Sequence, residues 1–432
     1  MKLTYPVIIV PGITASNLQD EYLIDPETIW SALKKDYERI ALHPDDLRYE
    51  ALEPARVRAG KLFEIAYNEL INELRYNLKD KEDLPVPVYP FPYDWRMPLE
   101  FIQKQLDDFI TEVIDRTKLL KHYNKEKYAD DTKVNLVGHS MGGLIITGYL
   151  KSKGKKSPVN KVVTLATPFQ GSFEAVIKII TGTANLGTSP PSSREREAAR
   201  ITPGLYYLLP SFKNGITTDT DLPVSFFNPE IWQTGVYQSL EEFIRLKGLP
   251  AQSSRKDEAR KLLTAMLNQA NEHRQKTDGF ELKNAGLNKD RWLAVVGVDS
   301  ETRVKLKISK IGKSPNFELS SDDRMNKWNS IDEIERRQTG DGTVPFEGAI
   351  PKFLKEENLV CVSPDDFGYW EIQDKALTKI AGFHGMLPNM NMLHRLIVRF
   401  FKDKDDPRGN TWGRPAPGIA KQNWDPPLGF KD

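Results

Sequence analysis

Short apolar runs separated by helical patterns organise most of this chain. Uninterrupted apolar runs of about four to eight residues are typical of strands that are buried on both faces. Such runs occur at residues 6–10, 133–137, 161–166, 292–298 and 358–363, and the proline-rich segment 84–91 ends in a further expected strand. Residues 99–119 instead repeat apolar side chains at helical spacing. The pattern predicts an α/β fold with a mostly parallel sheet and helices on both faces.

One apolar run ends in a pattern that carries chemistry. Val134–Val137 is followed by Gly138-His139-Ser140-Met141-Gly142, and a helical pattern begins directly afterwards. Strand, tight turn and helix together predict a nucleophile elbow of the G-x-S-x-G type. Glycines two residues before and after the serine avoid a clash where strand and helix cross, and the serine itself occupies strained backbone. The alternative is a glycine-rich turn whose serine has no chemical role.

A single connection is far longer than one crossover helix requires. From residue 167 to residue 291, about 125 residues separate the fourth and fifth expected strands. Because this insertion leaves the chain just after the strand that follows Ser140, we expect a helical cap or lid; an ordinary helical subdomain is the alternative. The predicted division is 1–171 and 291–402 for the two parts of the core, 172–290 for the cap, and 403–432 for an irregular tail.

A serine nucleophile needs a general base, which follows it in the chain in this architecture. His273, His384 and His394 follow Ser140. His273 lies on a charged helix and is predicted to be a solvated surface residue, whereas His394 is expected on a helix face. His384 lies in a loop between Gly382 and Gly385, which allows the imidazole to project into a cleft, so it is the predicted base. His139 is rejected because its side chain should point away from the reactive side of the serine.

The base in turn needs an acid that orients it. Asp299 follows the strand 292–298, where a simple hydrolase would carry the acid. Asp341 lies in Gly340-Asp341-Gly342, where glycines free a loop to direct a carboxylate. The residues alone leave both candidates open.

The loop after the first strand is the second half of the predicted site. Two backbone N–H groups should hold an oxyanion, one from Met141 and one from Ile13, and Gly12 permits the close turn between them. Gly12 and Thr14 of this loop are predicted substrate contacts, as is Phe169 after the fourth strand.

The composition of the chain limits the kinds of partner and the cellular location that we expect. The chain has 432 residues, of which 61 are basic and 60 are acidic, so its formal charge of +1 offers no bulk attraction to nucleic acid. Cys361 is the only cysteine, which excludes an intrachain disulfide. No apolar run has the length of a signal-peptide core or a membrane span. We therefore expect a cytoplasmic protein, with secretion by a leaderless route left open.

Several motifs occur in one order along the chain. They are Val-Pro-Gly at 10–12, Tyr-Asp-Trp-Arg at 93–96, Gly-His-Ser-Met-Gly at 138–142, Ala-Thr-Pro-Phe-Gln-Gly-Ser at 166–172, Leu-Tyr-Tyr-Leu-Leu-Pro at 205–210, Gly-Asp-Gly-Thr-Val-Pro at 340–345 and Phe-His-Gly at 383–385. From about residue 6 to residue 400, this set resembles the lecithin:cholesterol acyltransferase-like branch of the α/β-hydrolases. The resemblance implies Asp341 as the acid, an acyl ester of a lipid or phospholipid as substrate, and a cap with a mobile lid.

Two departures from that family shape the expected activity. With one cysteine, the chain cannot form the disulfide-closed lid of secreted animal members, and Gly12-Ile13-Thr14-Ala15-Ser16 lacks the second glycine of the common Pro-Gly-x-x-Gly-Ser version. The expected function is a serine hydrolase that forms an acyl-enzyme, needs no metal or cofactor and touches a membrane or micelle transiently. Acyl transfer to an alcohol is the alternative, and a non-enzymatic binding protein on the same fold is the third hypothesis.

Overall fold

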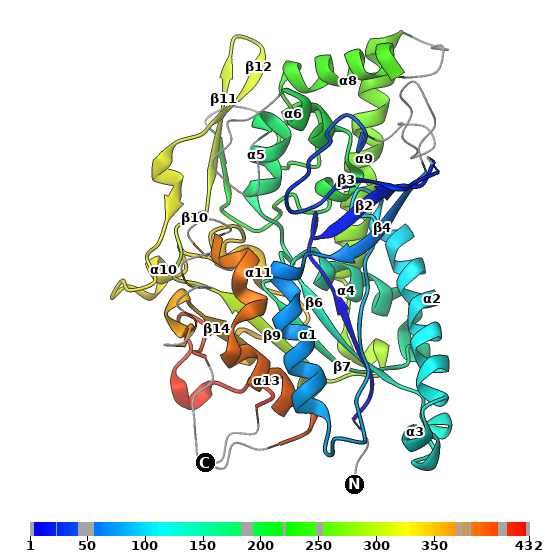
Figure 1. The fold of residues 1–432 in the computed structure, drawn as a ribbon. Helices are drawn as coiled ribbons and strands as arrows, with labels where there is room; N and C mark the ends of the chain where they lie inside the picture. Colours follow the sequence, from blue (N-terminus) through cyan, green and yellow to red (C-terminus); the bar gives the residue numbers. More distant parts are fainter. Residues whose placement is uncertain are drawn as a thin grey trace.

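Six parallel strands form the centre of the part of the chain that the structure describes (Figure 1). The computed structural model describes residues 4–22, 24–41, 56–182, 193–218, 222–247, 254–368, 371, 375, 378, 382–404 and 413–428. In sheet order, the strands are β14 (Leu359–Val362), β9 (Trp292–Gly297), β7 (Val159–Leu165), β6 (Val134–His139), β1 (Val7–Val10) and β5 (Val88–Pro90). Every pairing in this sheet is parallel. The predicted mostly parallel sheet is therefore confirmed.

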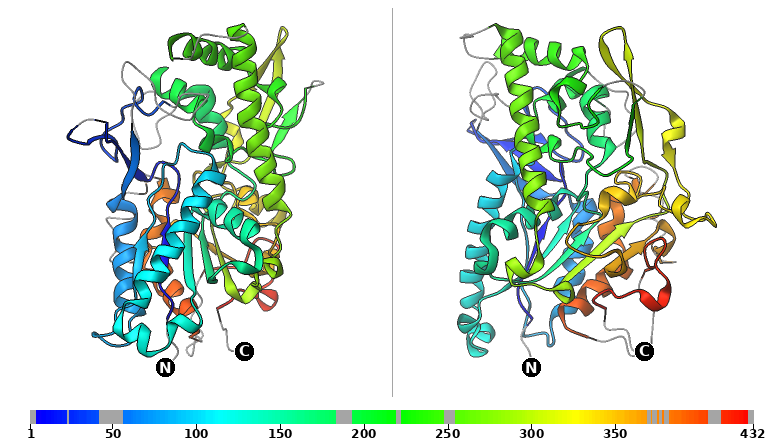
Figure 2. Two further views of the ribbon diagram at one scale, coloured as in Figure 1. Left: turned by 90° about the vertical axis from the view of Figure 1, so that its right-hand side faces the viewer. Right: turned by 180° about the vertical axis from the view of Figure 1, so that it is seen from behind.

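Helices cover both faces of the sheet, as expected. Helices α1 (Glu64–Leu78) and α13 (Asn391–Phe401) pack together on one face, and α2 (Leu99–Lys118) and α4 (Met141–Lys153) on the other (Figures 1 and 2). Strand residues alternate between the two layers: Val7 and Ile9 join the core beneath α1 and α13, whereas Ile8 and Val10 join the core beneath α2 and α4. Every residue of β1, β6, β9 and β14 is buried, as expected for strands that are covered on both faces.

A helical layer lies beyond the carboxyl ends of β1 and β6. It contains α5 (Phe173–Thr181), α6 (Ser193–Arg200), α7 (Pro203–Tyr206), α8 (Thr234–Lys247) and α9 (Arg255–Asp278). Figure 2 shows α9 running from this layer down beside the core, where it contacts α4. The short strand β8 (Ile216–Thr218) pairs with β11 (Leu306–Ile311), which pairs with β12 (Ser314–Glu318). A strand from the predicted cap, residues 172–290, thus pairs with a hairpin from the predicted second part of the core, residues 291–402. The division of the chain at these boundaries stays a prediction.

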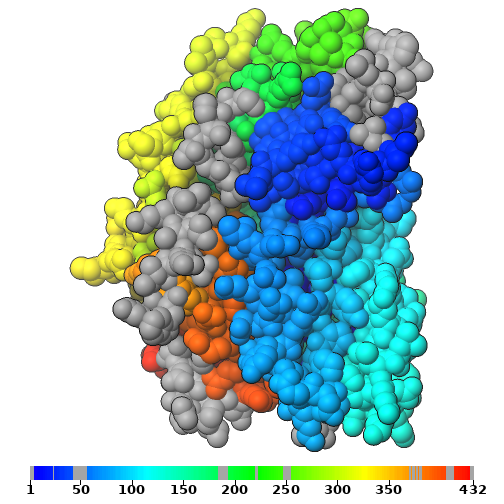
Figure 3. Space-filling model, in the orientation of Figure 1, coloured from blue at the N-terminus to red at the C-terminus, as the bar shows by residue number. Residues whose placement is uncertain are grey.

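A second, antiparallel sheet precedes α1 and was not expected from the sequence. Its order is β3 (Glu27–Trp30), β2 (Ser16–Asp20) and β4 (Val57–Leu62). In Figure 3 this N-terminal segment covers the front of the upper half, beside the green helical layer. It therefore forms one wall of the space beyond the central sheet.

The remaining strands and α-helices are short. They are α3 (Lys121–Lys125), β10 (Thr302–Arg303), β13 (Arg324–Met325), α10 (Glu333–Arg336) and α11 (Phe346–Ala349).

The C-terminal tail packs against the core. Arg414 exchanges backbone hydrogen bonds with Cys361, and Trp424 Nε1 donates to the carbonyl of Leu359. The tail residues 405–412 and 429–432 lie outside the described residues. Among the described helices, none combines the length and the apolar character that a bilayer crossing requires.

Candidate active site

Ser140 occupies a strained corner between β6 and α4. Its φ of 53° and ψ of −126° lie outside the regions that non-glycine residues normally adopt. The flanking glycines have the steric role that the motif predicts. A Cβ on Gly142 would lie 2.1 Å from the carbonyl oxygen of Val10, and one on Gly138 would lie 2.8 Å from the amide nitrogen of Gly143. The sharp turn brings the serine hydroxyl to the start of α4, where amide N–H groups are unpaired.

The structure brings Ser140, His384 and Asp341 into one hydrogen-bonded chain. His384 Nε2 lies 2.9 Å from Ser140 Oγ, and His384 Nδ1 lies 2.7 Å from Asp341 Oδ2. Asp341 Oδ1 accepts the amide N–H groups of Thr343 and Val344, at 2.9 and 2.7 Å. Because Oδ2 is left to accept from Nδ1–H, the lone pair of Nε2 faces the serine hydroxyl. This is the tautomer that a general base requires.

The other candidates lie elsewhere. Asp299 Oδ1 accepts a hydrogen bond from the Asn326 side chain at 2.9 Å and does not contact His384. His394 is buried, and its Nε2 donates to the carbonyl of Pro388.

The prediction that His273 is a solvated surface residue is wrong. It is 4% exposed, and the amide of Gln103 lies 2.8 Å from its Nε2. Gly148 of α4 makes this close packing possible, because a Cβ there would lie 2.7 Å from His273 Nε2. Burial, followed by the charges of Arg274 and Lys276, lowers the pKa of His273 to about 3.

A buried polar chain behind the serine joins the two halves of the site. The amide N–H of Gly12 donates to Tyr67 Oη at 2.9 Å, and Tyr67 Oη lies 2.6 Å from His139 Nδ1. His139 Nε2 lies 3.0 Å from the carbonyl oxygen of His384, so Nε2 carries the proton and Tyr67 donates to Nδ1. Burial, with the neighbouring His384, holds the pKa of His139 well below its usual value. Tyr67 lies in α1, and no sequence motif marks it.

The predicted oxyanion and substrate residues do not all lie together. Met141 is the first residue of α4, and Gly12, Ile13 and Thr14 line a cavity that also contains Ser140 and His384. The loop that contains Gly12 lies close to the serine, because a Cβ on Gly12 would lie 3.0 Å from Ser140 Cβ. Phe169 lies outside the cavity lining. Its ring packs edge-on against Phe353 in the core and is not part of the substrate site proposed below.

The cavity has a volume of about 550 Å³ and lies between the N-terminal sheet, the helical layer and the carboxyl ends of the central strands. Its lining has an apolar part and a polar part. The apolar part includes Trp30, Ile40, Phe63, Trp95, Leu205 and Leu208, and the polar part includes Ser172, Glu174, Arg303, Arg324 and Thr343. A cavity with these two sections beside a hydroxyl nucleophile suits an amphipathic ester.

Comparisons with known proteins bear on the family and the fold of the chain. A family model described as lecithin:cholesterol acyltransferase matches residues 59–293. The crystal structure of the Tle4–Tli4 complex is similar in fold, with a TM-score of 0.58 and 15% identity over 94% of this chain and 100% of that chain. Phospholipase PlaB from Legionella pneumophila aligns with 17% identity over 41% of this chain and 27% of its own, and its TM-score of 0.23 supports no argument. No curated protein sequence matches significantly.

Proposed function

Because the chain belongs to the lecithin:cholesterol acyltransferase family, we propose that it is a serine hydrolase that cleaves acyl esters of lipids. The family places it among lipid-acting acyl hydrolases and acyltransferases. The observation that carries the proposal is the continuous path from Ser140 Oγ through His384 to Asp341, at 2.9 and 2.7 Å. Nucleophile, base and orienting acid with this geometry perform acyl transfer through a covalent intermediate.

In the proposed mechanism, Ser140 Oγ attacks the ester carbonyl carbon while His384 Nε2 accepts the hydroxyl proton. The N–H groups of Met141 and Ile13 stabilise the oxyanion, and Asp341 stabilises the imidazolium. Collapse of the tetrahedral intermediate breaks the bond between the carbonyl carbon and the alcohol oxygen, and His384 returns the proton to the leaving alcohol. A water molecule then repeats these steps on the acyl-enzyme, which releases a fatty acid and restores Ser140.

An alcohol that replaced water in the second half-reaction would give acyl transfer. Product analysis distinguishes the two reactions. With a lipid ester and an added long-chain alcohol, the hydrolase proposal predicts mainly free fatty acid, whereas mainly new ester would assign the chain to acyl transfer.

The proposal is tested by replacing the nucleophile. Ser140→Ala should lower the turnover of a short p-nitrophenyl ester by about 10⁴-fold or more, because no other described hydroxyl contacts His384. A matched control is Ser211→Ala, which removes a hydroxyl in the helical layer that contacts Arg274 and leaves the triad intact. Turnover by a purified Ser140→Ala protein that is similar to the wild-type rate would contradict the proposal.

A further inference from the structure

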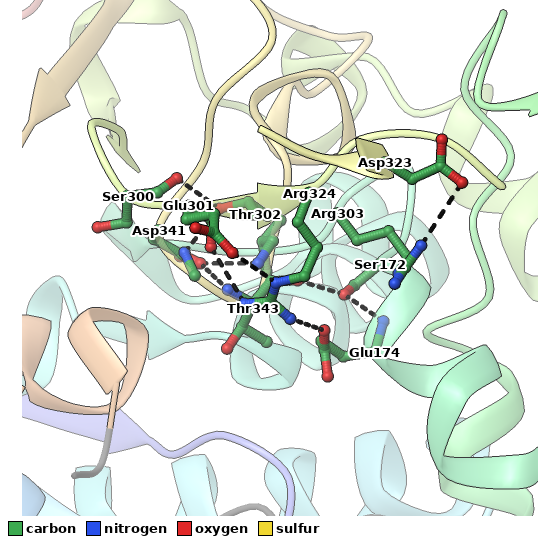
Figure 4. A network of polar contacts seen from close by, with 12 residues as sticks. Ser172, Glu174, Ser300, Glu301, Thr302, Arg303, Asp323, Arg324, Asp341 and Thr343 are labelled. Atoms are coloured by element: carbon green, nitrogen blue, oxygen red, sulfur yellow. Dashed lines mark hydrogen bonds and ion pairs between the residues drawn. The ribbon is translucent and has the colours of Figure 1, made fainter. Parts of the chain in front are cut away.

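One wall of the cavity carries three charged side chains that the proposed mechanism does not use. Glu174 comes from the first turn of α5, and Arg303 and Arg324 come from the paired strands β10 and β13. All three line the same cavity as Ser140 and His384. Figure 4 shows both arginine side chains extending from the yellow strands toward Glu174. These three residues are named the arginine wall.

Arg303 has more hydrogen-bond donors than partners. It is 7% exposed, yet among the described residues only its Nη1 forms a hydrogen bond, to the carbonyl of Ser320 at 3.0 Å. Asp323 lies behind it, with a carboxylate oxygen 3.6 Å from Nη1. A guanidinium has five N–H donors. The remaining donors of Arg303 are not among the fully buried side-chain atoms that lack a partner, so they are open to the cavity and can donate to an acceptor there.

Arg324 is held in a similar way from behind. Its Nε donates to Glu301 at 3.0 Å, while its Nη1 lies 3.7 Å from Glu174, beyond hydrogen-bond distance. Neither Asp323 nor Glu301 lines the cavity. The acidic groups that position the arginines thus lie outside the cavity lining, and this wall presents two cations and one carboxyl group to the cavity. Lys178 and Glu195 also line the cavity and form an ion pair with each other, with 3.4 Å between Nζ and Oε1.

Hydrogen bonds attach this wall to the loop that carries Asp341. The amide N–H of Gly342 donates to Oγ1 of Thr302 at 2.8 Å, and Thr302 is the residue directly before Arg303. Ser172 donates to the carbonyl of Thr343 and also accepts the amide N–H of Glu174. Figure 4 shows Asp341 and Thr343 beside the arginines. Because Ser140 and this wall line the same cavity, a substituent of an ester bound at Ser140 can extend toward the wall.

We propose that Arg303 and Arg324 form a subsite for the phosphate group of a phospholipid substrate, while the apolar part of the cavity takes an acyl chain. Guanidinium groups bind phosphate oxygens through paired, charge-assisted hydrogen bonds. Glu174 then serves as a weak counter-charge for the arginines when no phosphate is bound. This inference rests on the proposed ester hydrolase function and assigns residues for head-group recognition within it.

The test compares two esters that differ only in the phosphate-containing head group. Dioctanoyl phosphatidylcholine and dioctanoylglycerol are presented in the same detergent micelles, and the ratio of their kcat/KM values is measured. Arg303→Gln and Arg324→Gln should each lower this ratio by about tenfold or more while dioctanoylglycerol turnover stays near the wild-type value. Retained turnover of the neutral ester shows that each variant is folded.

Two further variants distinguish recognition of the phosphate group from a purely structural role of the arginines. Lys305→Gln removes a positive charge from the same segment, outside the cavity lining, and should leave the ratio unchanged. Glu174→Gln should maintain or raise the ratio, since it removes a competing carboxylate. A loss of both substrates in equal proportion in the arginine variants, or a fall in the ratio in Glu174→Gln, would mean that the network is only structural and would overturn the subsite.

The controls also separate this inference from the proposed function. A wild-type ratio near one, with Ser140-dependent turnover of both esters, would contradict the head-group subsite and leave the hydrolase intact. Absence of turnover of either ester would contradict the hydrolase itself. Inorganic phosphate is added in a separate arm. An Arg303-dependent effect of phosphate on dioctanoylglycerol turnover, without a preference for the phospholipid, would assign the arginines to free phosphate and overturn the proposal.

Discussion

The hydroxyl of Tyr67 links the loop of Gly12 to the backbone of His384. It accepts from the Gly12 amide at 2.9 Å and donates to His139, whose other nitrogen holds the His384 carbonyl. Tyr67→Phe keeps the ring and removes both hydrogen bonds, so the proposed oxyanion loop and the proposed base lose a shared support. We expect kcat to fall by about tenfold with KM nearly unchanged, measured by steady-state kinetics on a p-nitrophenyl ester.

The control for this change is Tyr123→Phe. Tyr123 is also fully buried, and its hydroxyl donates to the carbonyl of Thr4, away from the cavity. It should lower the free energy of unfolding without a change in kcat. If the two variants lost activity equally, the Tyr67 hydroxyl would have no specific role in positioning the site.

His273 makes stability depend on pH. Its imidazole stays neutral in the folded protein down to about pH 3, whereas the unfolded chain takes up a proton near the usual value of 6.5. Between these values the unfolded state binds more protons, so the free energy of unfolding falls as the pH falls, by at most about 1.4 kcal/mol per pH unit. His273→Gln should therefore flatten the pH dependence of the denaturation midpoint between about pH 6 and pH 4, and an unchanged slope would contradict this origin.

At the scale of elements, the crossing of α4 over β1 depends on glycine. Because a Cβ on Gly142 would lie 2.1 Å from the Val10 carbonyl oxygen, Gly142→Ala must displace the strand or the helix. We expect a loss of more than about 3 kcal/mol in the free energy of unfolding, measured by denaturant titration. Gly235→Ala, where no atom lies within 4 Å of the added Cβ, should unfold at the wild-type midpoint or above it. Equal stability of the two variants would show that the crossing tolerates a side chain.

Elements with continuous apolar patterns were predictable, and elements with polar patterns were not. The strands that became β1, β6, β7, β9 and β14 are mostly apolar, because they are buried on both faces, although β6 and β7 also contain polar residues such as Asn135 and Lys161. The antiparallel strand β2 has the sequence Ser-Asn-Leu-Gln-Asp and buries Ser16 and Asp20. Asp20 is compensated by an ion pair with Arg39 at 2.6 Å, a partner that no local pattern indicates. Polar burial of this kind depends on tertiary contacts.

The same distinction applies to the candidate site. His384 and Asp341 are each adjacent to a glycine, and Ser140 lies two residues from Gly138 and from Gly142. Chain order together with the family resemblance selects these three residues, so local sequence carries the signal. The predicted loop around His384 is wrong, because residues 382–386 are helical. Tyr67, Arg303 and Arg324 lie in regular elements with no motif. Their significance comes from which groups surround them, and only the folded structure shows this. The burial of His273 could not be predicted for a related reason. The many charged residues of α9 suggest an exposed helix, and the sequence does not show that Gly148 of α4 packs closely against His273.

At the scale of the whole molecule, the helical layer and the N-terminal sheet both contribute residues to the walls of the cavity. The predicted mobile cap implies that these walls separate to admit a large apolar substrate. Separation would expose apolar lining to water, and a lipid surface would favour that open form. We expect turnover of a short-chain phospholipid to rise at least about threefold as its concentration passes the critical micelle concentration. A rate that follows a single hyperbola through that concentration would indicate a cap that does not move.

The central claim is that Ser140 is a nucleophile activated by His384. The most direct measurement is intact-protein mass spectrometry after brief exposure to a fluorophosphonate, followed by peptide mapping. We expect one adduct per chain on Ser140 in the wild-type protein, and no adduct in Ser140→Ala or in His384→Ala under the same exposure. Labelling at another residue, or equal labelling of Ser140 in wild-type and His384→Ala proteins, would contradict the role of Ser140 as a nucleophile activated by His384.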